Sequence, residues 1–434
     1  MRNNMDVSSF KNIIAEWLSE WTPPPLNKRT LTPVNFKKLS DILAVIGPRR
    51  SGKTYYMYQL IIELFANGVA RDEILFLDFE DFRLNDMKPS DIENLFTAFY
   101  QLTDRNPSFL FFDEVHNMPQ WSKVLRTLHN QGRYKIIISG SNSKLLAKEI
   151  STELRGRYRD IMMLPFSFQE ILRLKNISWD RKTFHIPTKG GLIRVFDDYL
   201  KEGGFPEVIK RDNNTEKRHL LQSYYQTLFY RDILERHNIR AKVVMESLMQ
   251  YCLDTFGNLF SVSAFANLLK SNDMPISKKT VSNYMNYLRD AFFVIINEKF
   301  DFSPRKRLMN PKKIYLLDVG FANLATSFSE NRGRFLENIV AIELFRRQEE
   351  MFYYKNRYEC DFVVKQGLKP NLAIQVCWEM DINNRNRELK GLYEAMKKFK
   401  LKQGLILTYH QEGEERLNDL SVEVLPVWKW LLNV

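Results

Sequence analysis

The residues whose types and spacing most clearly predict chemistry form the sequence GPRRSGKT near the N-terminus. This loop follows the apolar run Ile42 to Ile46 and precedes a stretch of helical periodicity. Such a loop can bind phosphates, because its backbone N–H groups and the positive end of the helix dipole face one point. The pattern, known as Walker A, predicts a nucleotide site formed by Gly47, Pro48, Arg49, Arg50, Ser51, Gly52, Lys53 and Thr54.

Two of these side chains and two acids further along have predicted roles of their own. We expect Lys53 to reach the β and γ phosphate oxygens in catalysis, and the Thr54 hydroxyl to ligate magnesium. A second apolar run, Phe109 to Phe112, ends in Asp113 and Glu114. At the carboxyl edge of a parallel sheet, Asp113 would hold the magnesium shell and Glu114 would orient and deprotonate the attacking water. The alternative is a solvated pair of loop acids.

Another apolar run, IIISGSNS, carries polar side chains where it ends. Ser139, Ser141 and Asn142 stand there, within reach of the γ-phosphate or the water if the run is a neighbouring strand. We favour Ser141 for this catalytic role. The alternative is a simple turn, because Ser and Asn are common turn formers.

The elements that must position these residues follow from the alternation of apolar runs and helical segments. Short apolar runs predict a parallel sheet buried on both faces, so the first domain is expected to be α/β. Helical periodicity then predicts a lid or linker, followed by helices with a hairpin, typical of a winged helix, and a second α/β unit. The predicted parts are residues 1–30 (N-terminal helix and linker), 31–165 (phosphate-loop core), 166–240 (helical lid or linker), 241–318 (winged-helix-like domain) and 319–434 (second α/β domain).

The stretch from residue 261 to residue 291 is typical of a helix-turn-helix. Ser277 is a suitable N-cap, and Val281, Tyr284, Tyr287 and Leu288 are spaced to face inward. The outward residues and a basic loop are candidates for contacts with DNA: Lys278, Lys279, Asn283, Asn286, Arg305, Lys306, Arg307, Lys312 and Lys313. The alternative is a solvated face on a module that contacts protein.

Several motifs occur in an order that resembles one family. They are GPRRSGKT, FFDEVHNMPQW, ISGSNSKLL, ELRGRY, LPFSFQEIL, GGFPEV and YRDILER. Over most of its length the chain resembles the AAA+-type prokaryotic P-loop ATPases joined to a C-terminal domain of unknown function. The resemblance implies an AAA+-like fold, ATP with Mg²⁺ as ligand, a helical lid, and a tail with a winged helix and a restriction-endonuclease-like domain.

In ELRGRY, Arg155 and Arg157 are candidates for an arginine finger that reaches the γ-phosphate of a neighbouring subunit. The alternative is an ordinary surface pair. A finger of this kind requires a homo-oligomer, and the sequence does not specify an oligomeric state.

The restriction-endonuclease-like part departs from a working nuclease. Glu337 or Glu343 and Asp361 are candidate acids, but Gln375 and Cys377 stand where an acid and a lysine are needed. Glutamine binds magnesium poorly and a thiol does not replace an ammonium, so we expect this domain to bind without cutting.

Charge and composition limit the possible partners and the cellular location. The net charge of +12 favours a nucleic-acid partner, although acidic residues are interspersed along both halves. Three widely spaced Cys residues argue against a disulfide framework, and no apolar run is long enough to span a membrane, so a cytoplasmic location is expected. The leading hypothesis is an ATPase acting as a switch or motor on DNA, or less readily RNA. The alternatives are a signalling or chaperone-like ATPase that binds only protein, and an ATP-regulated nuclease.

Overall fold

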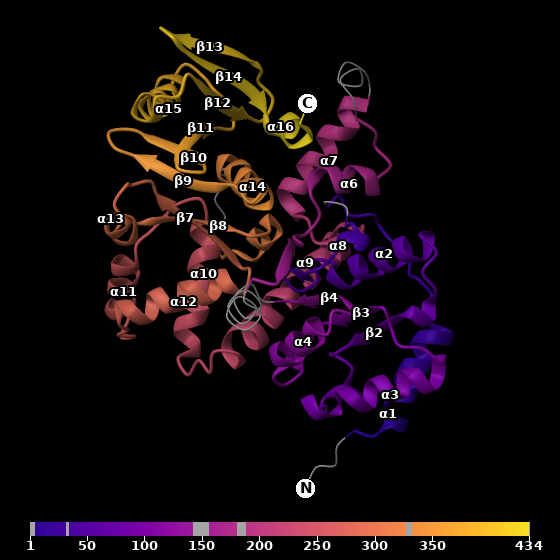
Figure 1. The fold of residues 1–434 in the computed structure, drawn as a ribbon. Helices are drawn as coiled ribbons and strands as arrows, with labels where there is room; N and C mark the ends of the chain where they lie inside the picture. Colours follow the sequence, from indigo (N-terminus) through magenta and orange to yellow (C-terminus); the bar gives the residue numbers. More distant parts are fainter. Residues whose placement is uncertain (1–4, 32–33, 142–155, 180–187, 327–331, 434) are drawn as a thin grey trace. The chain divides into compact units, whose positions relative to one another are not determined.

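The computed structural model describes residues 5–31, 34–141, 156–179, 188–326 and 332–433. The chain divides into two compact units, Met1–Leu164 (unit 1) and Pro165–Val434 (unit 2). Each unit has a sheet and surrounding helices (Figure 1). The α/β class predicted from the sequence is therefore confirmed.

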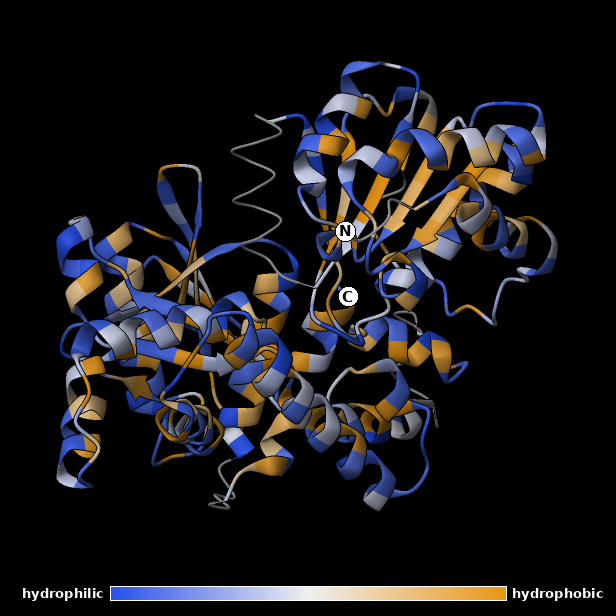
Figure 2. Cartoon of the chain, turned by 90° about the horizontal axis from the view of Figure 1, so that it is seen from below, coloured by the Kyte–Doolittle hydropathy of each residue, from blue (hydrophilic) through white to orange (hydrophobic). Residues whose placement is uncertain are grey.

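Unit 1 contains a five-stranded sheet in which every pair of neighbours is parallel, in the order β2-β3-β4-β1-β5. Its central strands are almost wholly apolar, as Figure 2 shows, which fits strands that are buried on both faces. The edge strand of residues 158–162 instead carries the exposed Arg159 and Asp160. The strands are β1 (Ile42–Ile46), β2 (Ile74–Asp78), β3 (Phe109–Asp113), β4 (Lys135–Gly140) and β5 (Tyr158–Met162). The α-helices are α1 (Val7–Ala15), α2 (Lys53–Ala66), α3 (Ile92–Thr103) and α4 (Trp121–Asn130).

The N-terminal segment is part of unit 1, although the sequence analysis gave it as a separate helix and linker. Helix α1 packs against α3, and Phe10 and Ile14 are fully buried. After α1, Trp17 lies in the core of unit 1, and its indole N–H donates to the carbonyl of Ile74 at 2.7 Å. A tryptophan fills the core and satisfies a strand carbonyl at the same time, which ties the segment to the sheet.

Unit 2 begins with helices that make up the predicted lid or linker, residues 166–240. They are α6 (Phe168–Leu174), α7 (Thr188–Glu202), α8 (Pro206–Ile209), α9 (Asn214–Thr227) and the π-helix η9 (Leu228–Glu235). The Asp318 carboxylate accepts hydrogen bonds from the backbone N–H groups of Gly204 and Gly320 at 2.7 and 2.9 Å. The GGFPE turn is therefore bonded to the chain just after strand β8 (Lys312–Leu316).

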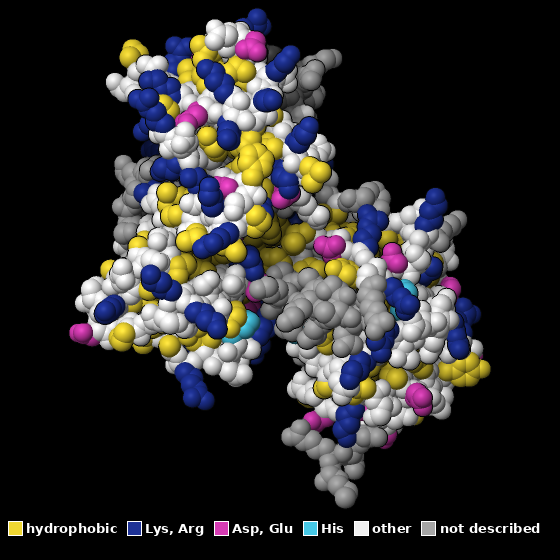
Figure 3. Space-filling view, turned by 60° about the vertical axis from the view of Figure 1, so that its left-hand side comes forward, with side chains coloured by type: hydrophobic (Ala, Val, Ile, Leu, Met, Phe, Trp, Pro, Cys, Tyr) yellow, Lys and Arg dark blue, Asp and Glu magenta, His cyan; other side chains and the backbone are white. Residues whose placement is uncertain are grey.

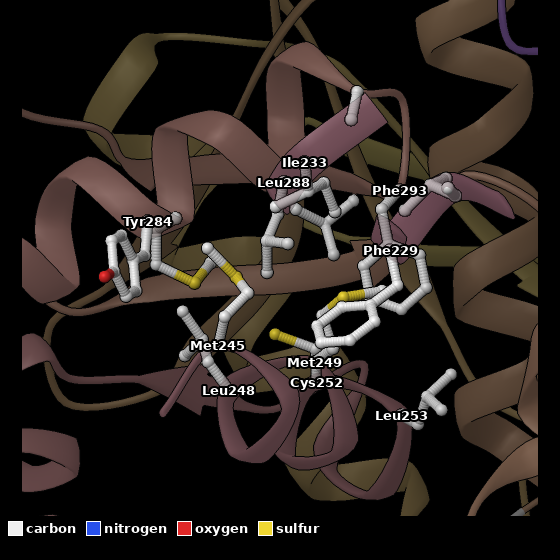
Figure 4. Packing of buried hydrophobic residues seen from close by; sticks show 14 of the residues in the cluster. Phe229, Ile233, Met245, Leu248, Met249, Cys252, Leu253, Tyr284, Leu288 and Phe293 are labelled. Atoms are coloured by element: carbon white, nitrogen blue, oxygen red, sulfur yellow. The ribbon is translucent and has the colours of Figure 1, made fainter. Parts of the chain in front are cut away.

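A buried hydrophobic cluster holds the middle of unit 2 together. Helices α10 (Lys242–Thr255), α11 (Val262–Ser271) and α12 (Lys278–Asp290) contribute to it. Figure 4 shows Met245, Met249 and Cys252 on α10 facing Leu288 and Phe293. Burial raises the pKa of the Cys252 thiol to about 12, so this cysteine serves as a small apolar residue.

One nine-stranded sheet runs through the rest of unit 2, in the order β13-β14-β12-β11-β10-β9-β7-β8-β6. The antiparallel pair of β7 (Val294–Lys299) and β8 joins this sheet through parallel pairing of β7 with β9. The predicted boundary at residue 318 therefore falls within a continuous sheet. The other strands are β6 (Leu259–Phe260), β9 (Glu350–Lys355), β10 (Glu359–Gln366), β11 (Lys369–Val376), β12 (Gln403–Thr408), β13 (Gly413–Leu417) and β14 (Leu420–Pro426). The helices beside them are α13 (Pro304–Met309), α14 (Arg332–Arg346), α15 (Arg385–Phe399) and α16 (Val427–Leu432).

Candidate functional site

The loop of residues 47–54 connects β1 to α2, as the sequence predicted. Gly52 is the N-cap of α2 and has a left-handed backbone with φ of 96°, which favours glycine. A Cβ on Gly47 would lie 2.0 Å from the carbonyl oxygen of Met163, so this position has no room for a side chain. The loop therefore lies directly against the chain that follows β5.

Lys53 is buried, with 5% of its surface exposed. Its ammonium donates to the carbonyl of Pro48 at 3.2 Å and lies 3.1 Å from Glu114 Oε1. A charge with so little solvent needs partners, and these two contacts supply them. Phosphate oxygens at the same loop would be further acceptors for this ammonium.

Asp113 ends β3 and points toward the start of α2. Thr54 Oγ1 donates to Asp113 Oδ2 at 2.5 Å, and Ser139 Oγ donates to Asp113 Oδ1. Burial, with the charge of Glu114 beside it, raises the pKa of Asp113 to about 6. The hydroxyl and the carboxylate thus lie where both can ligate Mg²⁺, which needs one or two protein oxygens besides phosphate.

Glu114 adopts the left-handed conformation with φ of 44°, which is rare for a residue with a side chain. Its carboxylate lies 3.3 Å from His116 Nδ1 and accepts a hydrogen bond from the backbone N–H of Ser141 at 3.1 Å. Burial opposes its ionisation, yet Lys53, His116 and Arg49 together hold the pKa of Glu114 below its ordinary value. A carboxylate that stays ionised is suited to accept a proton from water.

The other predicted site residues include two arginines of the phosphate loop and a serine at the end of β4. Arg49 pairs with Glu80 at 2.6 Å, and Arg50 is exposed. Ser141 Oγ is buried and makes no hydrogen bond within the part of the chain that the structure describes. Its assignment to the γ-phosphate or the water stays a prediction.

Of the two candidate arginine fingers, the structure describes only Arg157. Arg157 is exposed and donates through Nη1 to Asn130 Oδ1. Arg155 and Asn142 lie outside the described residues. The finger therefore stays a prediction.

The sequence analysis missed three residues of this site. Asp78 pairs in register with Asp113 at the ends of β2 and β3, and burial raises its pKa. The signal was present, because Asp78 also ends an apolar run. His116 lies two positions after Glu114, within the motif FFDEVHNMPQW, so its proximity to Glu114 could have been found from the sequence. Arg29 carries no such signal, since only the fold brings it to the phosphate loop.

In unit 2 two of the predicted nuclease-like acids, together with the unpredicted Glu359, surround a lysine. The Lys313 ammonium lies 2.9 Å from Glu337, 2.8 Å from Glu359 and 2.8 Å from Asp361. The sequence analysis placed Lys313 in a basic loop facing phosphates, whereas it is 3% exposed and faces these acids. It projects inward because it belongs to a strand of the sheet rather than to the loop.

The other residues of the nuclease-like pattern do not complete a hydrolytic site. Gln375 donates through Nε2 to Glu388 at 2.7 Å, so its amide is engaged with an acid. Burial raises the pKa of Cys377 to about 12, which keeps its thiol neutral. Glu343 pairs with Arg346 and Arg347 and lies outside the group around Lys313.

The candidate nucleic-acid residues lie mainly on the surface. Ser277 caps α12 by accepting from the N–H of Thr280 at 3.0 Å, and Val281, Tyr284 and Leu288 are buried as expected. Figure 3 shows this side of unit 2, where dark blue Lys and Arg are widespread and acidic side chains are sparse. The exposed candidates are Lys278, Lys279, Asn283, Arg305 and Lys306, while Arg307 and Lys312 are half-buried.

Comparison with known families agrees with the site in unit 1. Residues 39–172 match the family described as AAA domain, and residues 193–332 and 332–430 match two domains of unknown function (DUF8612 and DUF4143). The uncharacterized protein MJ1544 of Methanocaldococcus jannaschii is 36% identical over 404 residues, 91% of this chain and 88% of that protein. The chain belongs to this family of AAA-domain proteins.

One further curated protein and two solved structures are also similar to this chain. An uncharacterized protein of Haemophilus influenzae is 29% identical over 92% of this chain and 96% of its own length. The Walker-type ATPase PABY2304 of Pyrococcus abyssi has 14% identity and a TM-score of 0.44, over 74% of this chain and 95% of that one. The Aeropyrum pernix ORC1 protein in complex with DNA has 12% identity and a TM-score of 0.31, over 79% of this chain and 94% of that one.

Among the described residues, no helix has the length and apolarity needed to cross a membrane.

The raised pKa of Asp113 predicts that magnesium-dependent nucleotide affinity falls as the pH drops through about 6. A protonated carboxyl does not ligate Mg²⁺, so each pH unit below the pKa should cost up to about tenfold in affinity. Fluorescent ATP-analogue binding from pH 8 to 5 measures this. The Asp113→Asn variant controls for titration of the phosphates themselves, and identical pH profiles for the two proteins would refute the prediction.

The group around Lys313 predicts that Lys313→Met strongly destabilises unit 2. Three buried or half-buried carboxyl groups would lose their cation, at a cost of about 3–5 kcal/mol in the free energy of unfolding. Lys312→Met is the matched control, because the Lys312 ammonium pairs with the partly exposed Glu298. We expect its loss to cost at most about 1 kcal/mol in the free energy of unfolding. Denaturant unfolding compares them, and equal losses would contradict the assigned burial.

Proposed function

We propose that this AAA-domain protein binds ATP with Mg²⁺ in unit 1 and hydrolyses it. The observation that carries the proposal is the convergence of Lys53, Thr54, Asp113 and Glu114 at one sheet edge. Bound Mg²⁺ would neutralise charge on the phosphates and orient them for in-line attack. Its protein ligands would be Thr54 and Asp113, which already contact each other.

The chain's own residues then have separate roles in hydrolysis. Backbone N–H groups of residues 47–54 and the Lys53 ammonium would bind and orient the phosphates. Glu114 would take the proton of the attacking water; its lowered pKa keeps it ionised for this role, although it also makes the carboxylate a weaker base. Asp78 would add negative charge beside Asp113 and favour cation binding. In an oligomer, Arg155 or Arg157 would complete the site of a neighbouring subunit.

We further propose that unit 2 couples this cycle to nucleic acid, with DNA preferred over RNA. The support is a capped surface helix, α12, whose exposed Lys278 and Lys279 lie near its N-terminus, as in helices that enter the major groove. The short basic helix α13, between β7 and β8, adds the exposed Arg305 and Lys306 for phosphate contacts. Together these features favour an ATP-driven switch or motor on DNA.

A second candidate is an ATPase whose unit 2 binds only protein. One observation favours it: Phe302, just before helix α13, and Leu308 and Met309, at the end of that helix, are each at least 73% exposed. Exposed apolar side chains of this size commonly mark protein contacts. An ATP-regulated nuclease is opposed by the engaged Gln375, the neutral Cys377 and the lysine among the acids.

The ATPase proposal predicts different effects for two substitutions. Lys53→Ala should abolish ATP binding, because it removes the charge that meets the phosphates. Glu114→Gln should retain binding but lower turnover about a hundredfold or more, since the shape remains and the base is lost. Equilibrium ATP binding and phosphate release measure the two steps. Parental affinity in Lys53→Ala, or parental turnover in Glu114→Gln, would reject the assigned roles.

The nucleic-acid proposal predicts salt-dependent retention of duplex DNA. Reversing the charge of Lys278, Lys279 and Arg305 to Glu should weaken binding at least tenfold and flatten its dependence on salt, because fewer counterions are released. Reversal of the exposed Lys390 and Lys397 on α15 is the control. Retention that survives the first set of changes would favour the protein-binding alternative, and magnesium-dependent cleavage of the DNA would instead favour the nuclease.

A further inference from the structure

Arg29 is a buried arginine that no motif of the sequence includes, with 5% of its surface exposed. Its Nη1 donates to the carbonyl of Ser51 at 2.7 Å, and its Nη2 donates to the carbonyl of Leu164 at 2.6 Å. Its backbone N–H donates to Gln59 Oε1 on α2 at 2.9 Å. One guanidinium therefore bridges the phosphate loop and the last residue of unit 1.

The contact at Ser51 acts on a phosphate-binding group. The Ser51 carbonyl and the Gly52 N–H belong to one planar trans peptide, so they point in opposite directions. A guanidinium that fixes the carbonyl also fixes the direction of the N–H, and it polarises the peptide into a better donor. In a phosphate loop this N–H belongs to the donor set that meets the ligand.

The contact at Leu164 lies where the chain leaves unit 1, because Pro165 begins unit 2. The preceding residue, Met163, donates its N–H to the carbonyl of Ile46 at 2.7 Å and lies against Gly47. The start of the phosphate loop thus contacts Met163 directly, whereas Ser51 is linked to Leu164 through the Arg29 guanidinium. A shift of the loop when phosphate binds has a direct, solvent-excluded route to this connection.

We propose that Arg29 is a positioning residue that orients the Ser51–Gly52 peptide and couples nucleotide binding to the Leu164–Pro165 connection. The inference rests on the proposed nucleotide site. The fork of a guanidinium is needed, because its two nitrogens donate in different directions at once. An ammonium or an apolar side chain at residue 29 does not bridge both carbonyls in this way.

Hydrogen exchange with and without Mg²⁺ and a non-hydrolysable ATP analogue tests the coupling. In the parent protein, we expect slower exchange both in residues 47–56 and in residues 160–172. In Arg29→Met, we expect about tenfold weaker binding, from loss of a charged hydrogen bond. At saturating analogue the loop should still be protected, while protection of residues 160–172 should be lost.

Two further variants make the test specific. Arg71 also donates from its guanidinium to a backbone carbonyl in unit 1, that of Leu18 at 3.0 Å, so Arg71→Met should transmit protection normally. Arg29→Lys keeps the charge without the fork, should lose most of the transmitted protection, and replaces Arg29→Met if that variant does not fold.

The outcomes separate the coupling from the function on which it rests. If the parent protein shows no analogue-dependent protection of the loop, the proposed nucleotide site fails and the coupling fails with it. If the loop is protected and Arg29→Met protects residues 160–172 as the parent does, nucleotide binding stands and the coupling through Arg29 is overturned.

Discussion

The buried contact between the Lys53 ammonium and the Glu114 carboxylate holds the site of unit 1 together. Asp78, Asp113 and Glu114 bring three carboxyl groups to one edge of the sheet, where burial penalises their charge. Without a cation nearby, such a group of acids would repel itself and take up protons. The cation comes from the loop that is built to meet phosphates. The acids and the loop therefore depend on each other for their geometry.

A second buried lysine, Lys313, also balances buried carboxylates, but its surroundings differ from those of Lys53. Lys53 sits where a loop becomes a helix, with one carboxylate at 3.1 Å and a loop carbonyl as its other acceptor. Lys313 sits within a strand paired on both sides, with three carboxylates within 2.9 Å. In the first arrangement these two contacts use two of the three N–H donors of the ammonium. The second is already saturated, so it contributes to the fold rather than to ligand exchange.

The sequence predicts a site residue well when the segments around it along the chain determine its position, and poorly when distant segments do. The phosphate loop, Asp113 and Glu114 could be predicted because a strand, a turn and a helix in succession determine their placement. Lys313 was assigned to a basic loop, because neighbouring residues in the sequence are basic and only the pairing of β8 shows which side chains face inward. Arg29 meets Leu164 across 135 positions of the chain. No local pattern encodes such a contact.

The continuous sheet of unit 2 has a consequence for how this part of the chain can be divided. A fragment that stopped after β8 would expose the edge of β7 that normally pairs with β9, and an unpaired edge is a template for aggregation. It would also separate Lys313 from Glu337, Glu359 and Asp361, which all follow in the sequence. Helices α11 and α12 are thus attached to a hairpin that cannot be excised cleanly. A truncation that respects this architecture must keep the surface helices and the C-terminal strands on one fragment.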